Sequence, residues 1–294
     1  MDKYNQAIAD SQVITDDSQV AAKVNEILEK HLEENRTPEV LRQLFNCIDL
    51  TTLKSTDSQQ SVANFTERVN AFEQEHPELP NVAAICVYPN FVPIVRTVLD
   101  VSSVDIAAVA GCFPSAQSFI EVKMAEIALA VEAGADEIDI VFPLGDYLDN
   151  DYEEVADQLS EMKHACRESL LKVILETGAL KNARDIRNAS VLSLYSGADF
   201  LKTSTGKEYP GASLEAAYVM CQCIKEYYAK TQQPVGFKVA GGVSTTDDAL
   251  KYYTIVKEVL GEKWCGSNEL FRIGASRLAN NLLSDILGTE TKFF

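Results

Sequence analysis

The chain has 294 residues, of which 46% are hydrophobic and 24% charged, as in globular proteins that bury a large core. Its 44 acidic and 26 basic side chains give a formal net charge of −18. That charge excludes nucleic acids and anionic membranes as general partners, but not a small anionic ligand in a locally basic pocket. The chain start has no basic segment followed by an apolar core, and no apolar run approaches ~18 residues. We therefore expect a cytosolic protein without a signal peptide or membrane span.

The seven cysteines are scattered, and the three histidines lack ligand-spaced neighbours of a suitable type. Cys221 and Cys223 lie two residues apart on a predicted helix, so they point to different faces and make a poor metal pair. We predict reduced, mostly buried thiols, no metal site and no other cofactor.

Short β-branched runs alternate along the chain with longer segments of helical apolar spacing. Eight such units over about 245 residues have the number and size of a TIM (βα)8 barrel, with an open doubly wound sheet as the alternative. Gly134-Ala135-Asp136 and Gly197-Ala198-Asp199 precede two predicted strands and support a repeat. The predicted strands are 46–50, 82–87, 104–110, 137–142, 171–176, 199–203, 234–239 and 269–273.

Residues 1–45 precede the predicted barrel domain, which spans 46–288, and residues 289–294 form a tail that we expect to be frayed. Asp17-Ser18 and Thr37-Pro38 can each begin a helix, so the segment 1–45 is a predicted helical extension. It covers either the N-terminal end of the barrel or a subunit interface, and the sequence does not distinguish the two.

Strand side chains alternate, and the apolar set must face the surrounding helices. This rule directs the other set into the barrel, including three lysines and at least three carboxylates. The predicted inward residues are Cys47, Asp49, Glu137, Asp139, Val141, Lys172, Ile174, Glu176, Lys202 and Lys238.

Buried charges in a barrel interior have two interpretations. A self-satisfied network of ion pairs could fix strand register, or the charges could perform chemistry at the carboxyl ends of the strands. Lys202 and Lys238 favour the second, because adjacent strands place them about 5 Å apart. Two ammonium groups that close lower each other's pKa, as desolvation does, and a neutral lysine can attack a carbonyl. The pair therefore predicts a Schiff-base site.

The loops after the last three predicted strands are rich in glycine and hydroxyl groups. Gly206-Lys207, Gly241-Gly242 and Gly274-Ala275-Ser276 can present backbone N–H groups, and the third leads into a helix. Phosphate sites in this fold commonly use the loops after strands seven and eight. We predict a phosphorylated carbonyl substrate, held by its phosphate with its carbonyl at Lys202.

The lysine-containing segments resemble the deoxyribose-phosphate aldolase family. They are residues 200–207 (FLKTSTGK) and 236–243 (GFKVAGGV), and the resemblance extends from about 46 to 287. Further matching segments are 49–53 (DLTTL), 84–89 (AICVYP), 136–143 (DEIDIVFP) and 171–178 (LKVILETG). The resemblance implies a metal-independent class I aldolase that reversibly cleaves 2-deoxy-D-ribose 5-phosphate to D-glyceraldehyde 3-phosphate and acetaldehyde. It also implies a homodimer that takes part in deoxyribonucleotide catabolism.

By this resemblance Lys202 is the Schiff-base nucleophile, Lys238 lowers its pKa, and Asp139 shuttles protons. Asp49 matches a position near the substrate hydroxyls, although bracing Lys172 is an equally weighted alternative. Cys86 lines the site without a catalytic task. The expected substrate- and phosphate-binding residues are Asp49, Thr205, Gly206, Lys207, Gly241, Gly242 and Ser276.

Two positions depart from the family pattern. Ser276-Arg277 stands where bacterial members often carry two serines, so Arg277 replaces a hydroxyl, weakens the phosphate grip, or points away. The chain ends in Phe293-Phe294, where some members supply a tyrosine to the active site.

Three alternative functions remain: a Schiff-base aldolase with another phosphorylated substrate, a barrel that binds sugar phosphates without turnover, and a metal-assisted enzyme, which the histidines do not support.

Overall fold

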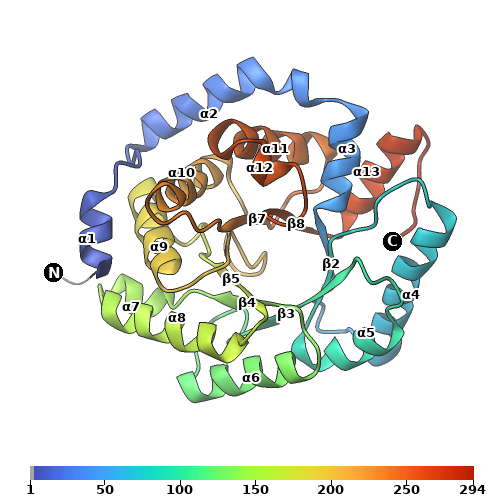
Figure 1. Ribbon diagram of the computed structural model, residues 1–294, viewed down its shortest axis with the longest axis horizontal. Coiled ribbons are helices and arrows are strands. Elements are labelled where there is room, and N and C mark those ends of the chain that lie inside the picture. The colour runs from blue at the N-terminus through green and yellow to red at the C-terminus, as the bar shows by residue number, and fades with distance from the viewer. Residues whose placement is uncertain (1–2) are drawn as a thin grey trace.

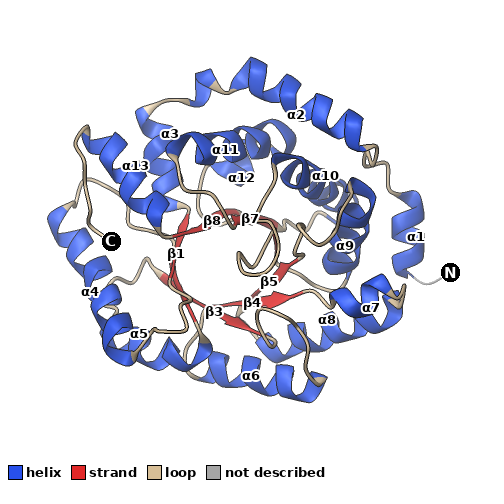
Figure 2. Ribbon diagram, turned by 180° about the vertical axis from the view of Figure 1, so that it is seen from behind, coloured by secondary structure: helices blue, strands red, loops and turns tan. Residues whose placement is uncertain are grey.

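Eight parallel strands close into a barrel in the computed structural model, which describes residues 3–294. Each strand pairs with the next in the sequence, and β8 pairs with β1, so the ring has no edge (Figure 2). All eight predicted strands are present, with bounds shifted by at most two residues. The TIM barrel is confirmed, and the open-sheet alternative is wrong. The strands are β1 (Ile48–Thr51), β2 (Ala84–Val87), β3 (Asp105–Ala110), β4 (Glu137–Val141), β5 (Leu170–Ile174), β6 (Phe200–Lys202), β7 (Gly236–Ala240) and β8 (Phe271–Ala275).

A ring of helices surrounds the strands, one after each strand (Figure 1). Their buried faces follow the predicted spacing: Val155, Leu159, Met162 and Cys166 of α8 are all buried. The ring comprises α4 (Gln59–Glu75), α5 (Val92–Val98), α6 (Ile120–Glu132), α8 (Tyr152–Cys166), α9 (Ala183–Tyr195), α10 (Leu214–Thr231), α11 (Thr246–Leu260) and α13 (Arg277–Leu287). Short segments lie between them: η2 (Pro89–Phe91), α7 (Leu144–Leu148) and α12 (Glu262–Cys265).

The apolar side chains of the strands form the layer between barrel and helices. Ile138, Ile140 and Leu201 belong to this core, and each is completely buried. Burying one such side chain contributes about 1.5–3 kcal/mol to stability. A strand therefore cannot exchange its apolar face for its charged face without a large loss of folding free energy. The alternation of the strands thereby fixes the direction in which the intervening charged residues point.

Two predicted inward residues lie outside the strands, Cys47 before β1 and Glu176 after β5. Cys47 caps the C-terminal end of α3 (Pro38–Asn46), and its N–H donates to the carbonyl of Gln43 at 3.0 Å. The side chain packs in the core outside the barrel together with Ile48. The prediction for Cys47 is wrong because β1 begins one residue later, after the helix cap.

The N-terminal extension forms helices, as predicted, and lies partly outside the ring. α1 (Lys3–Asp10) contacts α9, and α2 (Asp17–His31) runs along α10 and α11 (Figure 1). Asp16 caps α2, one residue before the predicted start, and Thr37 caps α3. A short 3-10 turn, η1 (Glu33–Asn35), joins α2 to α3, which packs against α13. The helices α1 and α2 therefore cover the side of the barrel rather than its N-terminal end.

The C-terminal tail is docked, which contradicts the expectation that it is frayed. The N–H groups of Phe293 and Phe294 donate to Asn280 Oδ1 at 2.7 and 3.0 Å. The ring centroid of Phe294 lies 5.4 Å from that of Phe72 and 6.1 Å from that of Phe45. The packing of the two terminal aromatic rings offsets the conformational entropy that is lost when the polar residues before them become ordered. Within residues 3–294, no helix is both long and apolar enough to cross a bilayer.

Replacing Phe72 with alanine should lower the free energy of unfolding by about 3–5 kcal/mol, because the ring is completely buried between α4, α3 and the tail. Phe119, which is 78% exposed, is the matched control, and Phe119→Ala should change stability by less than about 0.5 kcal/mol. Urea denaturation followed by circular dichroism measures both variants. Equal losses in the two would contradict the aromatic packing described above.

Candidate active site

Three residues that the sequence analysis placed in a catalytic group lie together inside the barrel. Lys202 of β6 and Lys238 of β7 are neighbours in strand register. Their ammonium groups donate to the same oxygen, Asp139 Oδ2, at 2.7 and 2.8 Å. Asp139 and Lys238 are completely buried, and Lys202 is 4% exposed. One carboxylate oxygen thus holds two ammonium groups away from water.

The two lysines differ in their electrostatic surroundings. Burial, together with the charge of Lys238, lowers the pKa of Lys202 against the opposing effect of Asp139. Burial also disfavours the charged form of Lys238, but Asp139 and Asp49 outweigh it and raise its pKa. Lys238 therefore keeps its proton, and Lys202 is the amine that loses one more readily.

Asp139 is ionised in this arrangement. Burial favours its protonated form, but the charges of Lys202, Lys238 and Lys172 outweigh that effect and lower its pKa below the usual range. An ionised carboxylate beside a neutral amine and an ammonium can accept and return protons without leaving its position. The cluster has the parts that amine catalysis requires.

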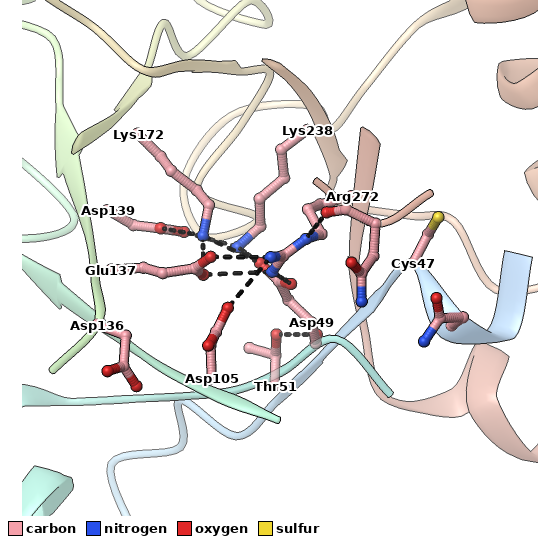
Figure 3. A network of polar contacts seen from close by, with 12 residues as sticks. Cys47, Asp49, Thr51, Asp105, Asp136, Glu137, Asp139, Lys172, Lys238 and Arg272 are labelled. Atoms are coloured by element: carbon pink, nitrogen blue, oxygen red, sulfur yellow. Dashed lines mark hydrogen bonds and ion pairs between the residues drawn. The ribbon is translucent and has the colours of Figure 1, made fainter. Parts of the chain in front are cut away.

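A deeper network of ion pairs supports this cluster from the closed end of the barrel (Figure 3). The ammonium of Lys172 contacts Glu137 and lies 3.5 Å from Asp49 Oδ2 and 3.7 Å from Asp139 Oδ1. Lys238 makes a further ion pair with Asp49. All five side chains are completely buried. Such a network fixes strand register, as the interpretation of these charges as ion pairs expects.

The network also contains Arg272 of β8, which the sequence analysis missed. Its Nη1 donates to Asp49 Oδ1 at 2.8 Å, and its Nη2 lies 3.0 Å from Glu137 Oε1. The alternation of β8 could have revealed it, since Phe271 and Ile273 face the helices and Arg272 must then face inward.

Asp49 occupies the position of a bracing residue. Its carboxylate contacts Lys172, Lys238 and Arg272, and none of its surface is exposed. Burial would raise its pKa, but these three cations lower it well below the usual range. Of the two interpretations of Asp49, the geometry favours support of the lysines over direct contact with a substrate.

A second buried carboxylate positions the loop after β6. Glu176 accepts hydrogen bonds from the N–H and the hydroxyl of Thr205. The Thr205 hydroxyl in turn accepts from Lys207 N at 3.2 Å, and the Lys207 ammonium donates to the carbonyl of Leu53. Glu176 has a φ of 55°, a strained conformation for a non-glycine residue of the kind that clusters at functional sites. Thr205 and Lys207 thus belong to one tethered loop.

The glycine loops after β6, β7 and β8 converge, as predicted. Gly241 has a φ of +84°, and a Cβ there would lie 3.0 Å from Gly211 Cα and 3.4 Å from Gly206 Cα. Only glycine permits this approach of two loops. Gly241 borders a cavity of about 410 Å³ that Gly242, Gly274 and Ser276 also line. Ser276 precedes α13 without capping it, so the first N–H groups of that helix remain available to an anion.

Arg277 lies at the edge of this cavity. Its side chain is exposed and lines both the 410 Å³ cavity and an adjoining one of about 360 Å³, which Lys54 and Arg68 also border. A cation therefore stands where a second serine is common.

Cys86 lies inside the barrel in a small apolar cluster with Ala84 and Val109. Burial raises the pKa of its thiol, which favours the neutral form. All seven cysteines are free thiols.

Potential metal ligands do meet at one surface position. His31, Glu34 and Glu258 place ligand atoms within 4.8 Å of one another where α2 packs on α11. The statement that the histidines lack suitable neighbours is wrong for His31, because Glu258 is distant in the sequence. The group lies on the outer helices and contributes nothing to the barrel interior.

Comparison with known proteins gives a consistent result. The profile of the DeoC/LacD family aldolases matches residues 44–259. A Caenorhabditis elegans protein is 40% identical over 272 residues, which are 92% of this chain and 89% of its own length. Human deoxyribose-phosphate aldolase is 38% identical over 249 residues, 81% of this chain and 77% of the human protein. The solved structure titled as the tetrameric deoxyribose phosphate aldolase from Aeropyrum pernix has a TM-score of 0.68 at 24% identity, covering 89% of this chain and 97% of that one.

Replacing Lys172 with methionine should lower the free energy of unfolding by about 3–5 kcal/mol, because the completely buried Glu137 loses its closest cation. Lys23→Met removes half of an exposed ion pair with Glu26 and should cost less than about 1 kcal/mol. Urea denaturation at pH 7 measures both. If the two variants lose similar stability, the buried network does not have the strength described here.

Proposed function

The chain belongs to the DeoC/LacD family of aldolases, and from that premise we propose that it is a deoxyribose-phosphate aldolase that works through a Schiff base on Lys202. The substrate would be 2-deoxy-D-ribose 5-phosphate, and the products D-glyceraldehyde 3-phosphate and acetaldehyde. The observation that carries the proposal is the sharing of one Asp139 oxygen by Lys202 and Lys238, whose pKa values move in opposite directions.

The reaction begins with attack of the neutral Lys202 amine on the C1 aldehyde of the open-chain sugar. Loss of water gives a protonated imine, which withdraws electrons from the neighbouring carbons. Asp139, with Lys238 and an ordered water, accepts the proton of the C3 hydroxyl. The C2–C3 bond then breaks: its electron pair forms the enamine, and C3 becomes the aldehyde of glyceraldehyde 3-phosphate.

The second half of the reaction returns the proton. Protonation of the enamine carbon by the same acid–base group regenerates an imine, and hydrolysis releases acetaldehyde and the free Lys202 amine. The buried ion pairs of Asp139 and Lys238 hold these groups in place through both proton transfers. A barrel that only bound sugar phosphates would not need this costly arrangement.

The phosphate would occupy the cavity between the glycine loops and α13. The N–H groups at the start of α13, the Ser276 hydroxyl and the Arg277 guanidinium border this space. Lys207 extends from the tethered loop after β6 toward the chain that follows β1. Free cysteines fit the cytosolic location of the proposal, in which the enzyme acts as a homodimer in deoxyribonucleotide catabolism.

Lys202→Ala should lower kcat/KM for cleavage of deoxyribose 5-phosphate by about a thousandfold or more, because no other amine replaces the nucleophile. The circular dichroism spectrum should stay unchanged. Borohydride added to the wild-type enzyme with substrate should leave a reduced adduct that peptide mass spectrometry locates on Lys202. Lys230→Ala, on the exposed side of α10, is the control and should keep full activity. An adduct on another residue, or full activity of Lys202→Ala, would sink the mechanism.

Ser276→Ala and Arg277→Ala should each raise KM for deoxyribose 5-phosphate by about tenfold with little change in kcat, as expected for a lost charge-assisted hydrogen bond. Cleavage of unphosphorylated deoxyribose should be unaffected. Arg68→Ala serves as the control, since Arg68 borders only the adjoining cavity. Steady-state assays with both sugars measure the effect, and an equal loss with both would place the phosphate elsewhere.

A further inference from the structure

Arg272 is a buried charge that the proposed reaction does not use. It lies beside Lys238 in strand register, at the closed end of the interior, and its side chain is 4% exposed (Figure 3). Its guanidinium contacts Asp49 and Glu137, and it lies 3.4 Å from the half-exposed Asp105, whose charge water screens. Burying a guanidinium is expensive, so its presence calls for a physical reason.

The contacts connect Arg272 to the reactive amine through alternating charges. Arg272 donates to Asp49 Oδ1, and Asp49 Oδ2 pairs with Lys238. Lys238 donates to Asp139 Oδ2, the same oxygen that receives Lys202. Since each group in this chain is completely or almost completely buried, water screens little of the interaction between its two ends.

The charges joined by these ion pairs do not balance when every group is ionised. Of the residues that the structure describes, four buried bases and three buried carboxylates belong to this network, which leaves one excess positive charge within it. An excess buried charge costs several kcal/mol, and the loss of one proton from a lysine removes it. The bases are Lys172, Lys202, Lys238 and Arg272, and the carboxylates are Asp49, Glu137 and Asp139.

The contacts indicate which base loses the proton. Arginine does not deprotonate in proteins. Lys172 has three carboxylates within 4 Å and Lys238 has two, whereas Lys202 has one in the described part of the chain. Lys202 is also the base nearest the loops after the strands, at the last residue of β6. The excess charge therefore falls on Lys202.

Two other titratable groups face Lys202, and in the described part of the chain neither forms an ion pair with it. Glu176 approaches from the end of β5, and its oxygens accept from the N–H and the hydroxyl of Thr205, so this carboxylate is engaged by the loop after β6. Cys86 approaches from β2, and burial raises the pKa of its thiol. The balance between Arg272 and the three carboxylates thus decides the protonation of Lys202.

We propose that Arg272 is a positioning residue for the aldol reaction: its permanent charge occupies Asp49 and Glu137, so that Lys202 is left as the surplus cation and releases its proton. The inference rests on the proposed role of Lys202 as the nucleophile. It assigns a function to a residue that touches no reacting atom.

Arg272→Met should move the acid limb of the kcat/KM profile for deoxyribose 5-phosphate to higher pH. Removing a positive charge favours the protonated form of the remaining amines, so kcat/KM at pH 6 should fall by about tenfold. Above the limb, where Lys202 is neutral in both proteins, the variant should approach the wild-type rate. A loss that is uniform across pH would overturn the proposal, since a merely structural role gives that result.

Glu137→Gln is the matched variant of opposite sign. It removes a negative charge from the same network and keeps the side-chain size, so the acid limb should move to lower pH. The double variant Arg272→Met, Glu137→Gln restores the charge balance, and its limb should return toward that of the wild type. Arg272→Lys supplies a charge that can titrate, so its acid limb should lie between those of the wild type and Arg272→Met. If Arg272→Met fails to fold, the Glu137→Gln and Arg272→Lys profiles decide the question.

A measurement without sugar cleavage separates this inference from the proposed function. Acetaldehyde with cyanoborohydride alkylates neutral amines, and peptide mass spectrometry gives the rate at Lys202 relative to the exposed Lys230. The pH dependence at Lys202 should shift in the same directions in the variants. Shifts in labelling with no cleavage of deoxyribose 5-phosphate by the wild type would support the role of Arg272 and overturn the proposed substrate. Unchanged labelling profiles would overturn the role of Arg272 even in an active aldolase.

Discussion

One carboxylate oxygen, Asp139 Oδ2, receives two ammonium groups in the buried interior of the barrel, and the site depends on that contact. Lys238 has Asp49 as a further carboxylate partner, whereas the ion pair of Lys202 is with Asp139, so the proton of Lys202 is held less firmly. The contact requires β4, β6 and β7 to keep one register, because a slip by one residue would turn each side chain into the helix layer. The completely buried apolar faces of the strands make such a slip costly. Packing of the outer core therefore sets the geometry of the inner charges.

The barrel interior is divided between apolar and charged side chains. Ala84, Cys86, Ala107 and Val109 form an apolar cluster on β2 and β3, and Val141 and Ile174 form another on β4 and β5. The charges meet between these walls, where the low local dielectric strengthens each ion pair and penalises each unpaired group. The same surroundings that make the network stable thus make the charge of Lys202 expensive. The low dielectric of the interior therefore accounts both for the stability of the ion pairs and for the reactivity of the Lys202 amine.

Much of this arrangement follows from the alternation of strand residues alone. That rule directed Asp139, Lys202 and Lys238 inward before any contact was known, and it would have directed Arg272 inward as well. The start of each strand was harder to predict: β1 begins two residues later than expected, and Cys47 forms the C-terminal cap of α3. Contacts between distant segments, such as Glu176 with Thr205, His31 with Glu258, and the terminal phenylalanines with Phe72, have no local pattern in the sequence. The role of Asp49 stayed open for the same reason, since its partners come from three other strands.

The identity of the base at position 272 matters for this account. A lysine there would carry the same charge but could lose its proton when the interior has one charge too many, and Lys202 would then remain an ammonium. Arginine excludes that outcome, because its guanidinium stays protonated even when buried. Its several donors also reach Asp49 and Glu137 together, which come from strands on different sides of the barrel. With a permanent charge on β8 and a titratable one at the last residue of β6, Lys202 is the base of this network that can release a proton.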